Sequence, residues 1–294
     1  MAAEASTSAS RRGWDDHSAD YQSEHGTWLL GAGDGAGALM WCPQGWDEAE
    51  VSLLGDCSAL AGRSVVDIGT GGGQAAMWLA NQGADVVGVD ISYAQLTYAQ
   101  LTHASAARRS PLTPSDSGVT KTASSDPGVA NCGAHDSGAT EWLQADAAAL
   151  PLASEAFDIA ISAFGALAFT PSSDVFFVEI ARVLKPAGVA VISTPHPMRW
   201  IFPDDPGQPG LTAVQPYFDR TPYVETDDIG QPAYVEHHHT MSDIVTSVHN
   251  AGLSLERMWE PEWPDGHDRV WGGWGPITGA IYPRTLIIRC SKPA

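Results

Sequence analysis

The chain has 294 residues, enough for one α/β domain of ordinary size with additions. Its 35 acidic residues against 15 basic ones give a net charge of −20, which argues against a nucleic-acid partner, because phosphate binding needs a basic face. We expect no membrane span, since no apolar run approaches the roughly 18 residues that one needs. The four scattered cysteines form neither a zinc signature nor a disulfide framework, so we expect a cytoplasmic protein.

The N-terminal region differs in composition from the rest of the chain. Residues 1–13 are rich in Ala and Ser, lack the apolar core of a secretory signal, and are predicted to be a disordered tail. Residues 14–60 are predicted to form a helical cap, and residues 61–294 the main domain. The apolar anchors of the cap are aromatic: Trp14, Tyr21, Trp28, Trp41 and Trp46.

The most informative local pattern lies at residues 64–82. A β-branched run over 64–68 predicts a buried strand, and the residues from 75 to 82 predict the first turns of a helix. Between them stands D-x-G-x-G-x-G, from Asp67 through Gly69 and Gly71 to Gly73. Glycine lets the backbone turn sharply and touch a ligand without Cβ clashes. A strand, a glycine turn and a helix N-terminus predict a nucleotide-binding crevice in an open α/β sheet.

The glycine spacing distinguishes two classes of nucleotide. Enzymes that bind dinucleotides use G-x-G-x-x-G, and the partial match here (Gly71, Gly73, Ala76) starts too far into the helix. Asp67 at the strand end would also repel a pyrophosphate. A carboxylate there suits a cationic part of a ligand, such as an α-amino group.

Further elements follow in alternation. Strands are predicted at 84–89, 141–145, 157–162 and 189–193, and a helix at 175–184, which L-K-P-A-G at 184–188 breaks. The second strand ends in Asp90, whose carboxylate is placed to accept both ribose hydroxyls of an adenosine. Ile91 is placed to pack on the adenine face.

The order of D-x-G-x-G-x-G, V-D-I, A-D-A-x-x-L-P-L, F-D-I-A-I-S and L-K-P-A-G over about residues 60–195 resembles the type 11 small-molecule family of class I S-adenosylmethionine-dependent methyltransferases. The resemblance implies a Rossmann-like, doubly wound, seven-stranded and mostly parallel sheet with one antiparallel strand near the edge. It also implies S-adenosyl-L-methionine as cofactor. In the resembling family an aspartate at the position of Asp146 meets the adenine amino group, and a cap tyrosine at the position of Tyr21 closes over the cofactor. The residues predicted to bind the cofactor are Tyr21, Asp67, Gly69, Thr70, Gly71, Gly73, Asp90, Ile91, Asp146, Ala147, Ser162 and Ala163.

Residues 104–140 interrupt this pattern. They are rich in Ser, Thr, Pro, Gly and Asp and have almost no large apolar side chains, so they cannot bury enough surface to offset the entropy of ordering. We predict a disordered insertion, with a regulatory or phosphorylated loop as the alternative.

After the fifth strand, residues 194–236 are predicted to be irregular. T-M-S-D at 240–243 resembles a capping box, which predicts a helix over 244–250 with Gly252 as its stop signal. The last two strands, 253–259 and 285–290, are implied by the resemblance to pair antiparallel. Connectivity brings residues 194–236 and 260–284 to the carboxyl edge of the sheet, where with the cap they are predicted to enclose the site of methyl transfer.

Three groups of residues are candidates for chemistry. His196 follows the fifth strand and is predicted to be either a general base or a brace of its proline-rich turn. His237 and His239 share a face of a strand, but no third ligand has a fitting spacing, so no metal site is predicted. The tryptophans of the loop 259–274, with carboxylates among them, either hold a cationic or planar substrate or pin the loop to the domain.

The predicted function is methyl transfer from S-adenosylmethionine to an O, N or C nucleophile of a small molecule. No N-P-P-Y motif follows the fourth strand, which sets the chain apart from enzymes that methylate amino groups of nucleic acids or glutamine side chains of proteins. Two alternatives stay open: a cofactor-binding pseudoenzyme that recruits a partner, and a nicotinamide-dependent oxidoreductase. The sequence predicts neither the acceptor nor the oligomeric state.

Overall fold

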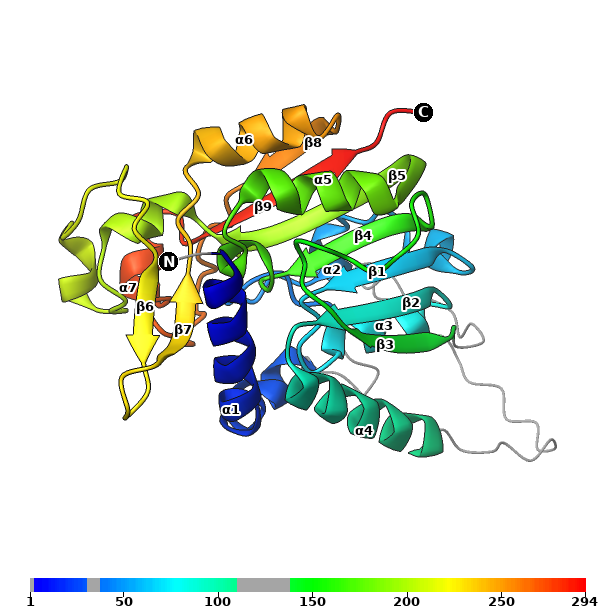
Figure 1. The fold of residues 1–294 in the computed structure, drawn as a ribbon, viewed down its shortest axis with the longest axis horizontal. Helices are drawn as coiled ribbons and strands as arrows, with labels where there is room; N and C mark the ends of the chain where they lie inside the picture. The colour runs from blue at the N-terminus through cyan, green and yellow to red at the C-terminus, as the bar shows by residue number, and fades with distance from the viewer. Residues whose placement is uncertain (1–2, 31–37, 110–137) are drawn as a thin grey trace.

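A seven-stranded sheet forms the centre of the molecule (Figure 1). The computed structural model describes residues 3–30, 38–109 and 138–294. The sheet has the order β3-β2-β1-β4-β5-β9-β8, and β9 is antiparallel to both of its neighbours. This is the predicted fold class. The strands are β1 (Ser64–Ile68), β2 (Asp85–Asp90), β3 (Thr140–Gln144), β4 (Phe157–Ala163), β5 (Leu184–Pro195), β8 (Ser254–Trp259) and β9 (Thr285–Ser291).

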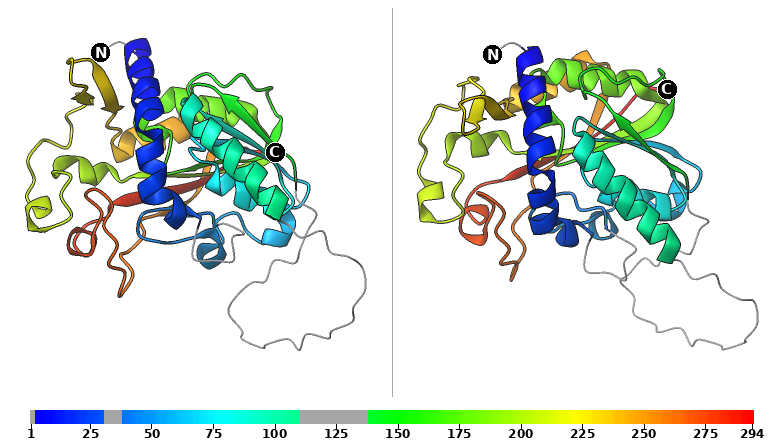
Figure 2. Two further views of the ribbon diagram at one scale, coloured as in Figure 1. Left: turned by 90° about the horizontal axis from the view of Figure 1, so that it is seen from below. Right: turned by 60° about the horizontal axis from the view of Figure 1, so that its bottom comes forward.

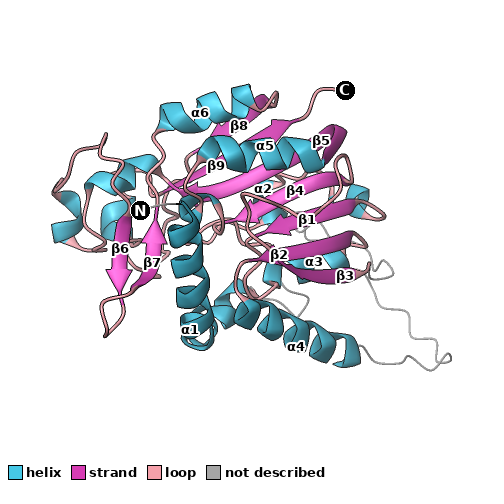
Figure 3. Ribbon diagram, in the orientation of Figure 1, coloured by secondary structure: helices cyan, strands magenta, loops and turns pink. Residues whose placement is uncertain are grey.

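Helices cover both faces of the sheet (Figures 1 and 3). The helix α5 (Ser173–Val183) and the helix α6 (Met241–Asn250) lie on one face, and α3 (Gln74–Asn81) lies on the other. The side chains of β1 explain why both faces are covered. Val66 and Ile68 belong to the hydrophobic core under α5, whereas Val65 belongs to the core under α3. Alternate side chains of a strand point to opposite faces, so β1 carries apolar side chains on both of its covered faces.

The sheet has its topological switch point at β1. This strand pairs in parallel with β2 on one side and with β4 on the other, so the chain leaves the carboxyl end of β1 where the two halves of the sheet diverge. Open α/β sheets bind their ligands in the crevice at this point. The glycine turn predicted from the sequence therefore lies at the carboxyl edge of the sheet.

The N-terminal helix α1 (Ala3–Leu29) is longer than predicted. The prediction of a disordered tail over residues 1–13 is wrong from Ala3 onward, because Ser6, Ala9 and Ser10 are buried in tertiary contacts. At Gly13 the helix comes so close to the chain that an added Cβ would lie 1.6 Å from the carbonyl oxygen of Ala233. The small residues at the start of the chain, from which we predicted a disordered tail, instead allow α1 to pack closely against the segment around Ala233.

Figure 2 shows how α1 is placed: it runs between the hairpin of β6 (Tyr223–Thr226) and β7 (Pro232–Glu236) and the helix α4 (Tyr93–Arg109). The hairpin lies within residues 194–236, which were predicted to be irregular. Its strands have only four and five residues, so their sequence carries little periodic signal. The helix α6 has the predicted capping box, in which the Thr240 and Asp243 side chains accept hydrogen bonds from each other's backbone N–H groups.

Shorter elements complete the described part of the chain. They are the helices α2 (Glu48–Val51) and α7 (Pro276–Gly279) and the 3₁₀ turns η1 (Cys57–Leu60), η2 (Leu167–Phe169), η3 (Pro197–Ile201) and η4 (Gln208–Leu211). Most of the predicted insertion, residues 110–137, lies outside the described residues; its first residues continue α4 to Arg109. Within the described ranges, none of the helices is long and apolar enough to cross a membrane.

Candidate active site

A large cavity opens at the carboxyl ends of β1, β2 and β4. Together with the open solvent at its mouth, it contains about 1250 Å³ of space. Its walls come from α1, residues 38–43, the glycine turn, the ends of β2, β3 and β4, and Trp271.

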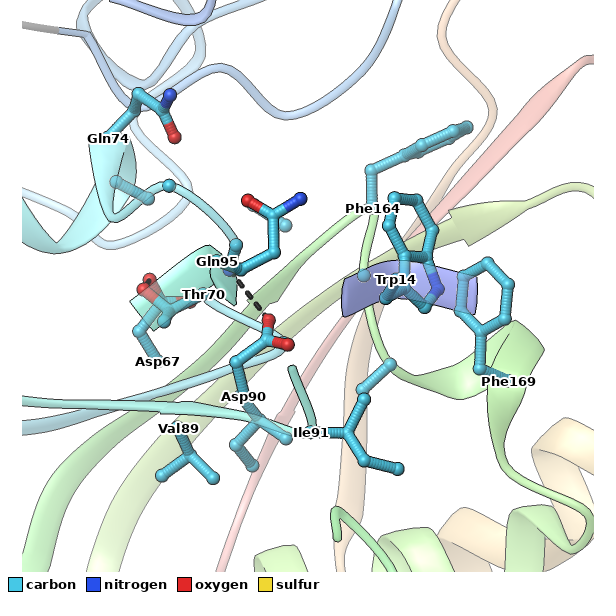
Figure 4. A pocket seen from close by; sticks show the side chains of 18 of the residues that line it. Trp14, Asp67, Thr70, Gln74, Val89, Asp90, Ile91, Gln95, Phe164 and Phe169 are labelled. Carbon is cyan, nitrogen blue, oxygen red and sulfur yellow. Dashed lines mark hydrogen bonds between the residues drawn. The ribbon is translucent and has the colours of Figure 1, made fainter. Parts of the chain in front are cut away.

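Asp90, the last residue of β2, lies at the centre of the polar wall (Figure 4). Its Oδ2 accepts a hydrogen bond from the backbone N–H of Gly71 (2.8 Å), and its Oδ1 accepts one from that of Ser92 (2.8 Å). Burial raises the pKa of this carboxyl to about 6. The side chain thus ties the glycine turn to the start of α4 and keeps lone pairs free for donors in the cavity.

Asp67 belongs to β1 and lies beside Asp90 in the same wall (Figure 4). Its Oδ2 accepts a short hydrogen bond from the Thr70 hydroxyl (2.6 Å). Burial, and to a lesser degree the charge of Asp90, raises the pKa of Asp67 to about 7. An approaching positive group would stabilise the ionised form of such a carboxyl.

The glycine turn presents its backbone to the cavity. The N–H groups of Gly69 and Thr70 both donate to the carbonyl oxygen of Val89, which anchors the turn to β2. Gly71 has φ +54°, and an added Cβ would find nothing within 4 Å, so this side of the turn is open. A Cβ on Gly72 would lie 2.6 Å from the Gln22 side chain, so a glycine is needed where α1 comes close.

Three buried glutamine side chains connect α1 to the domain next to this turn. Gln74 Nε2 donates to Gln22 Oε1 (2.8 Å), and Gln22 Nε2 donates to Gln95 Oε1 (2.8 Å). The chain of amides joins α1, α3 and α4, and all three side chains line the cavity. None of the three was predicted from the sequence.

Two further polar contacts hold α1 over the sheet. Asp15 Oδ1 accepts hydrogen bonds from the Ser92 hydroxyl (2.7 Å) and from the N–H of Ala94 (3.0 Å), at the start of α4. Thr7 donates its hydroxyl to Asp146 Oδ2 (3.1 Å) after β3. Thr7, Asp15 and Gln22 follow one another at intervals of about two helical turns, and this spacing in the sequence could have indicated a face that packs.

Aromatic side chains form the opposite wall; Figure 4 shows Trp14, Phe164 and Phe169 together, across the cavity from Asp67. The Trp14 ring meets the rings of Tyr21 and Phe169 edge to face, with centroids 5.3 and 5.4 Å away. Phe164, the first residue after β4, has φ +60°, a conformation that is strained for a bulky residue. Strain of this kind is common at ligand sites.

Most residues predicted to bind the cofactor meet in this cavity. Those that line it are Tyr21, Asp67, Gly69, Thr70, Gly71, Asp90, Ile91, Asp146, Ala147 and Ala163. The structure does not bring Gly73 and Ser162 to it. Gly73 is the N-cap of α3 and packs against Trp142, and the buried Ser162 hydroxyl accepts a hydrogen bond from the N–H of Ala166 (3.2 Å).

The candidate base His196 lies outside this cavity and lines a second, smaller one. Its Nε2 hydrogen-bonds to Glu260 Oε1 (2.8 Å), and its Nδ1 accepts from the N–H of Met198 (3.0 Å) at the start of η3. Burial lowers its pKa although Glu260 opposes the change. Strand β5 stays paired with β9 as far as Pro195, so His196 lies beyond the crevice. There its side chain braces the turn into η3.

The three consecutive histidines also serve the packing. His237 Nε2 lies 2.7 Å from the Ser6 hydroxyl, His238 Nε2 lies 2.7 Å from the Tyr217 carbonyl, and His239 Nε2 lies 2.9 Å from the Thr170 carbonyl. Among residues 3–30, 38–109 and 138–294 no group of three or more His, Cys, Asp or Glu side chains is placed to hold a metal ion.

The tryptophans of the loop 259–274 lie in different surroundings. Trp271 lines the cavity, whereas Trp263 donates its indole N–H to the His267 carbonyl (2.7 Å) and Trp274 donates to the Thr285 hydroxyl (3.1 Å). Residues 194–236, predicted to enclose the site, supply none of the described lining residues. They support α1 from its outer side instead (Figure 2).

Comparison with known proteins agrees with this architecture. The family model of the methyltransferase domain matches residues 66–192. No curated protein matches the sequence. Among solved structures, an S-adenosylmethionine-dependent methyltransferase from Mesorhizobium loti is 23% identical, with a TM-score of 0.57, and the match covers 83% of this chain and 96% of that chain.

A second solved structure is magnesium protoporphyrin IX methyltransferase from Synechocystis PCC 6803 with bound SAH. It is 15% identical, with a TM-score of 0.53, and the match covers 98% of this chain and 99% of that chain. At these identities the similarity establishes the fold. Residues 66–192 thus match the methyltransferase domain model, and the fold around them is that of S-adenosylmethionine-dependent methyltransferases of known structure.

Proposed function

We propose that the protein transfers the methyl group of S-adenosylmethionine to a nucleophilic atom of a small molecule. The observation that carries this proposal is one cavity with two unlike walls: a polar wall at the switch point of the sheet, and an aromatic wall made largely by α1. The polar wall suits a nucleoside with a cationic amino-acid tail, and the aromatic wall suits a second, less polar molecule.

The residues of the polar wall fit the cofactor. The Asp90 carboxylate has lone pairs for both ribose hydroxyls besides the two N–H groups it already accepts, and charge-assisted hydrogen bonds of this kind are worth about 1.5–3 kcal/mol each. Asp67 and Asp146 also line the cavity, and in this proposal Asp67 binds the α-amino group and Asp146 the adenine amino group. The open side of Gly71 lets the ligand approach the backbone without meeting a side chain.

The protein's part in the reaction is to orient the acceptor and to exclude water. When bound, S-adenosylmethionine supplies an activated methyl group together with its leaving group. Helix α1 closes one side of the cavity through Gln22 and Asp15, and the aromatic rings hold the acceptor against the polar wall. The negative charge of Asp67 and Asp90 makes the polar wall favourable for the positive groups of the cofactor.

The test is calorimetric titration with S-adenosylmethionine and S-adenosylhomocysteine, with NADH as the control. We expect micromolar binding of both sulfur nucleosides and none of NADH. Binding of NADH alone would favour an oxidoreductase instead. If the sulfur nucleosides bind, but no small molecule is methylated and a stoichiometric partner co-purifies, the protein is a cofactor-binding pseudoenzyme.

A further inference from the structure

The charges that line the cavity are all negative. Among the described lining residues the ionisable acids are Asp67, Asp90 and Asp146, and no Lys, Arg or His side chain is among them. The Arg269 guanidinium lies over the ring of Trp28, 4.5 Å from its centroid, outside the lining residues. A carboxylate or phosphate on the acceptor would therefore find no cationic partner among these lining residues, and desolvating such a group without one is costly.

The aromatic wall has a regular construction. Trp14, Tyr21 and Trp28 are spaced by seven residues, which is about two helical turns, so they share the face of α1 that lines the cavity. The Trp271 ring meets Trp28 (5.4 Å) and Tyr21 (6.0 Å) edge to face. On its other side Trp271 is stacked on His25, with centroids 3.9 Å apart and planes at 8°. Rings fixed in this way offer flat surfaces that cannot readily rearrange around a bulky aliphatic group.

The aromatic wall offers no side chain that could take a proton from the acceptor. Burial raises the pKa of Tyr21 well above its usual range and that of the Cys42 thiol to about 12, so both stay protonated. Asp67 and Asp90 lie on the polar wall, across from Trp14 (Figure 4), and Asp146 is held by Thr7 and by the N–H of Ala148. A protonated amine, whose lone pair is occupied, would therefore find no base on the aromatic wall, and the lining carboxylates that could act as one belong to the proposed cofactor site.

We infer that the acceptor is a flat, uncharged aromatic molecule whose reacting atom, such as a ring nitrogen, already has a free lone pair. This inference rests on the proposed function. The acceptor lone pair forms the new bond to the methyl carbon, and the electron pair of the broken S–C bond stays on sulfur. No proton leaves; the sulfonium charge disappears as an equal charge appears on the acceptor, so the cavity holds the same net charge throughout.

The test uses the full chain saturated with S-adenosylhomocysteine and three probes: quinoline, a quinoline carboxylate, and the aliphatic amine quinuclidine. Titration followed by tryptophan fluorescence measures their affinities. We expect quinoline to bind at least about tenfold more tightly than either of the others, because only quinoline is both flat and uncharged. Failure of S-adenosylhomocysteine to bind would contradict the proposed function itself.

Three outcomes would overturn the inference while leaving the proposed function intact. Equal or tighter binding of the carboxylate would mean that Arg269 reaches the acceptor. Tighter binding of quinuclidine would indicate a cationic aliphatic acceptor. If S-adenosylhomocysteine binds and none of the three probes does, the aromatic wall does not receive the acceptor.

A pair of variants locates the binding surface. Trp28→Leu should weaken quinoline binding by about fivefold or more and leave the affinity for S-adenosylhomocysteine unchanged. The matched control is Trp46→Leu, since Trp46 packs on Trp259 (5.9 Å) outside the cavity. Equal effects of the two substitutions would contradict the assignment. Trp271→Leu provides a second variant if Trp28→Leu does not fold.

The rate gives an independent readout. With saturating cofactor, turnover of quinoline should stay flat from neutral to mildly alkaline pH, because neither the acceptor nor the protein has to lose a proton. A rise of the rate with pH under these conditions would reveal a general base in the cavity and contradict the inference.

Discussion

Asp90 shows how one side chain connects the sheet, the turn and the ligand. Asp90 is the last residue of β2, so the strand places it at the carboxyl edge of the sheet. The hydrogen bonds that its carboxylate accepts from the N–H groups of Gly71 and Ser92 fix its orientation before a ligand binds. Because those two N–H groups are already satisfied, the remaining lone pairs face the cavity. Such preorganisation reduces the entropy that ligand binding would otherwise lose.

Replacing Asp90 by Ala should weaken cofactor binding by about 2–3 kcal/mol, which is about 30- to 150-fold. The fold should persist with a free energy of unfolding lower by about 1–3 kcal/mol, because the N–H groups of Gly71 and Ser92 lose their acceptor. Calorimetry gives the first quantity and chemical denaturation the second. The control is Asp85→Ala at the other end of β2, where the carboxylate accepts from the N–H of Ala139. Unchanged affinity in Asp90→Ala would mean that the ribose lies elsewhere.

At the scale of elements, α1 decides the shape of the cavity. One face of this helix carries both the residues that hold it in place and the rings that line the site. Asp15 attaches it to the start of α4, Gln22 to α3 and α4, and Thr7 to the segment after β3. On its outer side it packs against β7 at Gly13.

Asp15→Ala should loosen this helix. The substitution removes the acceptor of the Ser92 hydroxyl and of the N–H of Ala94, and loss of a cap of this kind costs about 1–2 kcal/mol. Hydrogen exchange of the α1 amides should therefore become faster, and cofactor affinity should fall. The matched control is Asp16→Ala, whose side chain is exposed. Equal exchange in the two variants would show that Asp15 does not hold the helix.

At the scale of the whole molecule, the charge distribution links binding to pH. The fold buries two carboxyls from neighbouring strands side by side, and burial raises the pKa of Asp67 to about 7 and that of Asp90 to about 6. In the ligand-free protein, groups with raised pKa contribute stability at low pH and lose it as the pH rises through 6 and 7. The ionised form of these carboxyls, to which we propose that the cofactor binds, is therefore the less stable form of the free protein.

Cofactor affinity should accordingly decrease as the pH falls through about 7 and then about 6. The ligand's ribose hydroxyls and amino group favour the ionised carboxylates, so binding at mildly acidic pH has to release protons. Calorimetry in buffers of different ionisation enthalpy counts these protons. Asp67→Asn should remove the step near 7 and keep the step near 6. A flat affinity profile across this range would contradict the roles of both aspartates.

Much of the fold could be predicted because its signals are local. The strand at 64–68 has the predicted bounds, the other strands of the seven-stranded sheet differ mainly at their ends, and the capping box at Thr240 begins the predicted helix. Prediction failed where the local structure depends on contacts between residues that lie far apart in the sequence. The Ala- and Ser-rich start of α1 is ordered by β7, more than 200 residues further along the chain. His196 faces away from the crevice because β9 extends the pairing of β5.

The sequence by itself determined the glycine turn and the carboxylates of the polar wall. The glycine turn and the carboxylates at the ends of β1 and β2 are set by strand patterns that lie within a few residues of the functional groups. Only the tertiary structure decided the aromatic half, where Trp14, Phe169 and Trp271 come from three distant segments. A contact between side chains separated by more than 100 residues leaves no periodic trace in the sequence, because it depends on where the completed sheet places each segment.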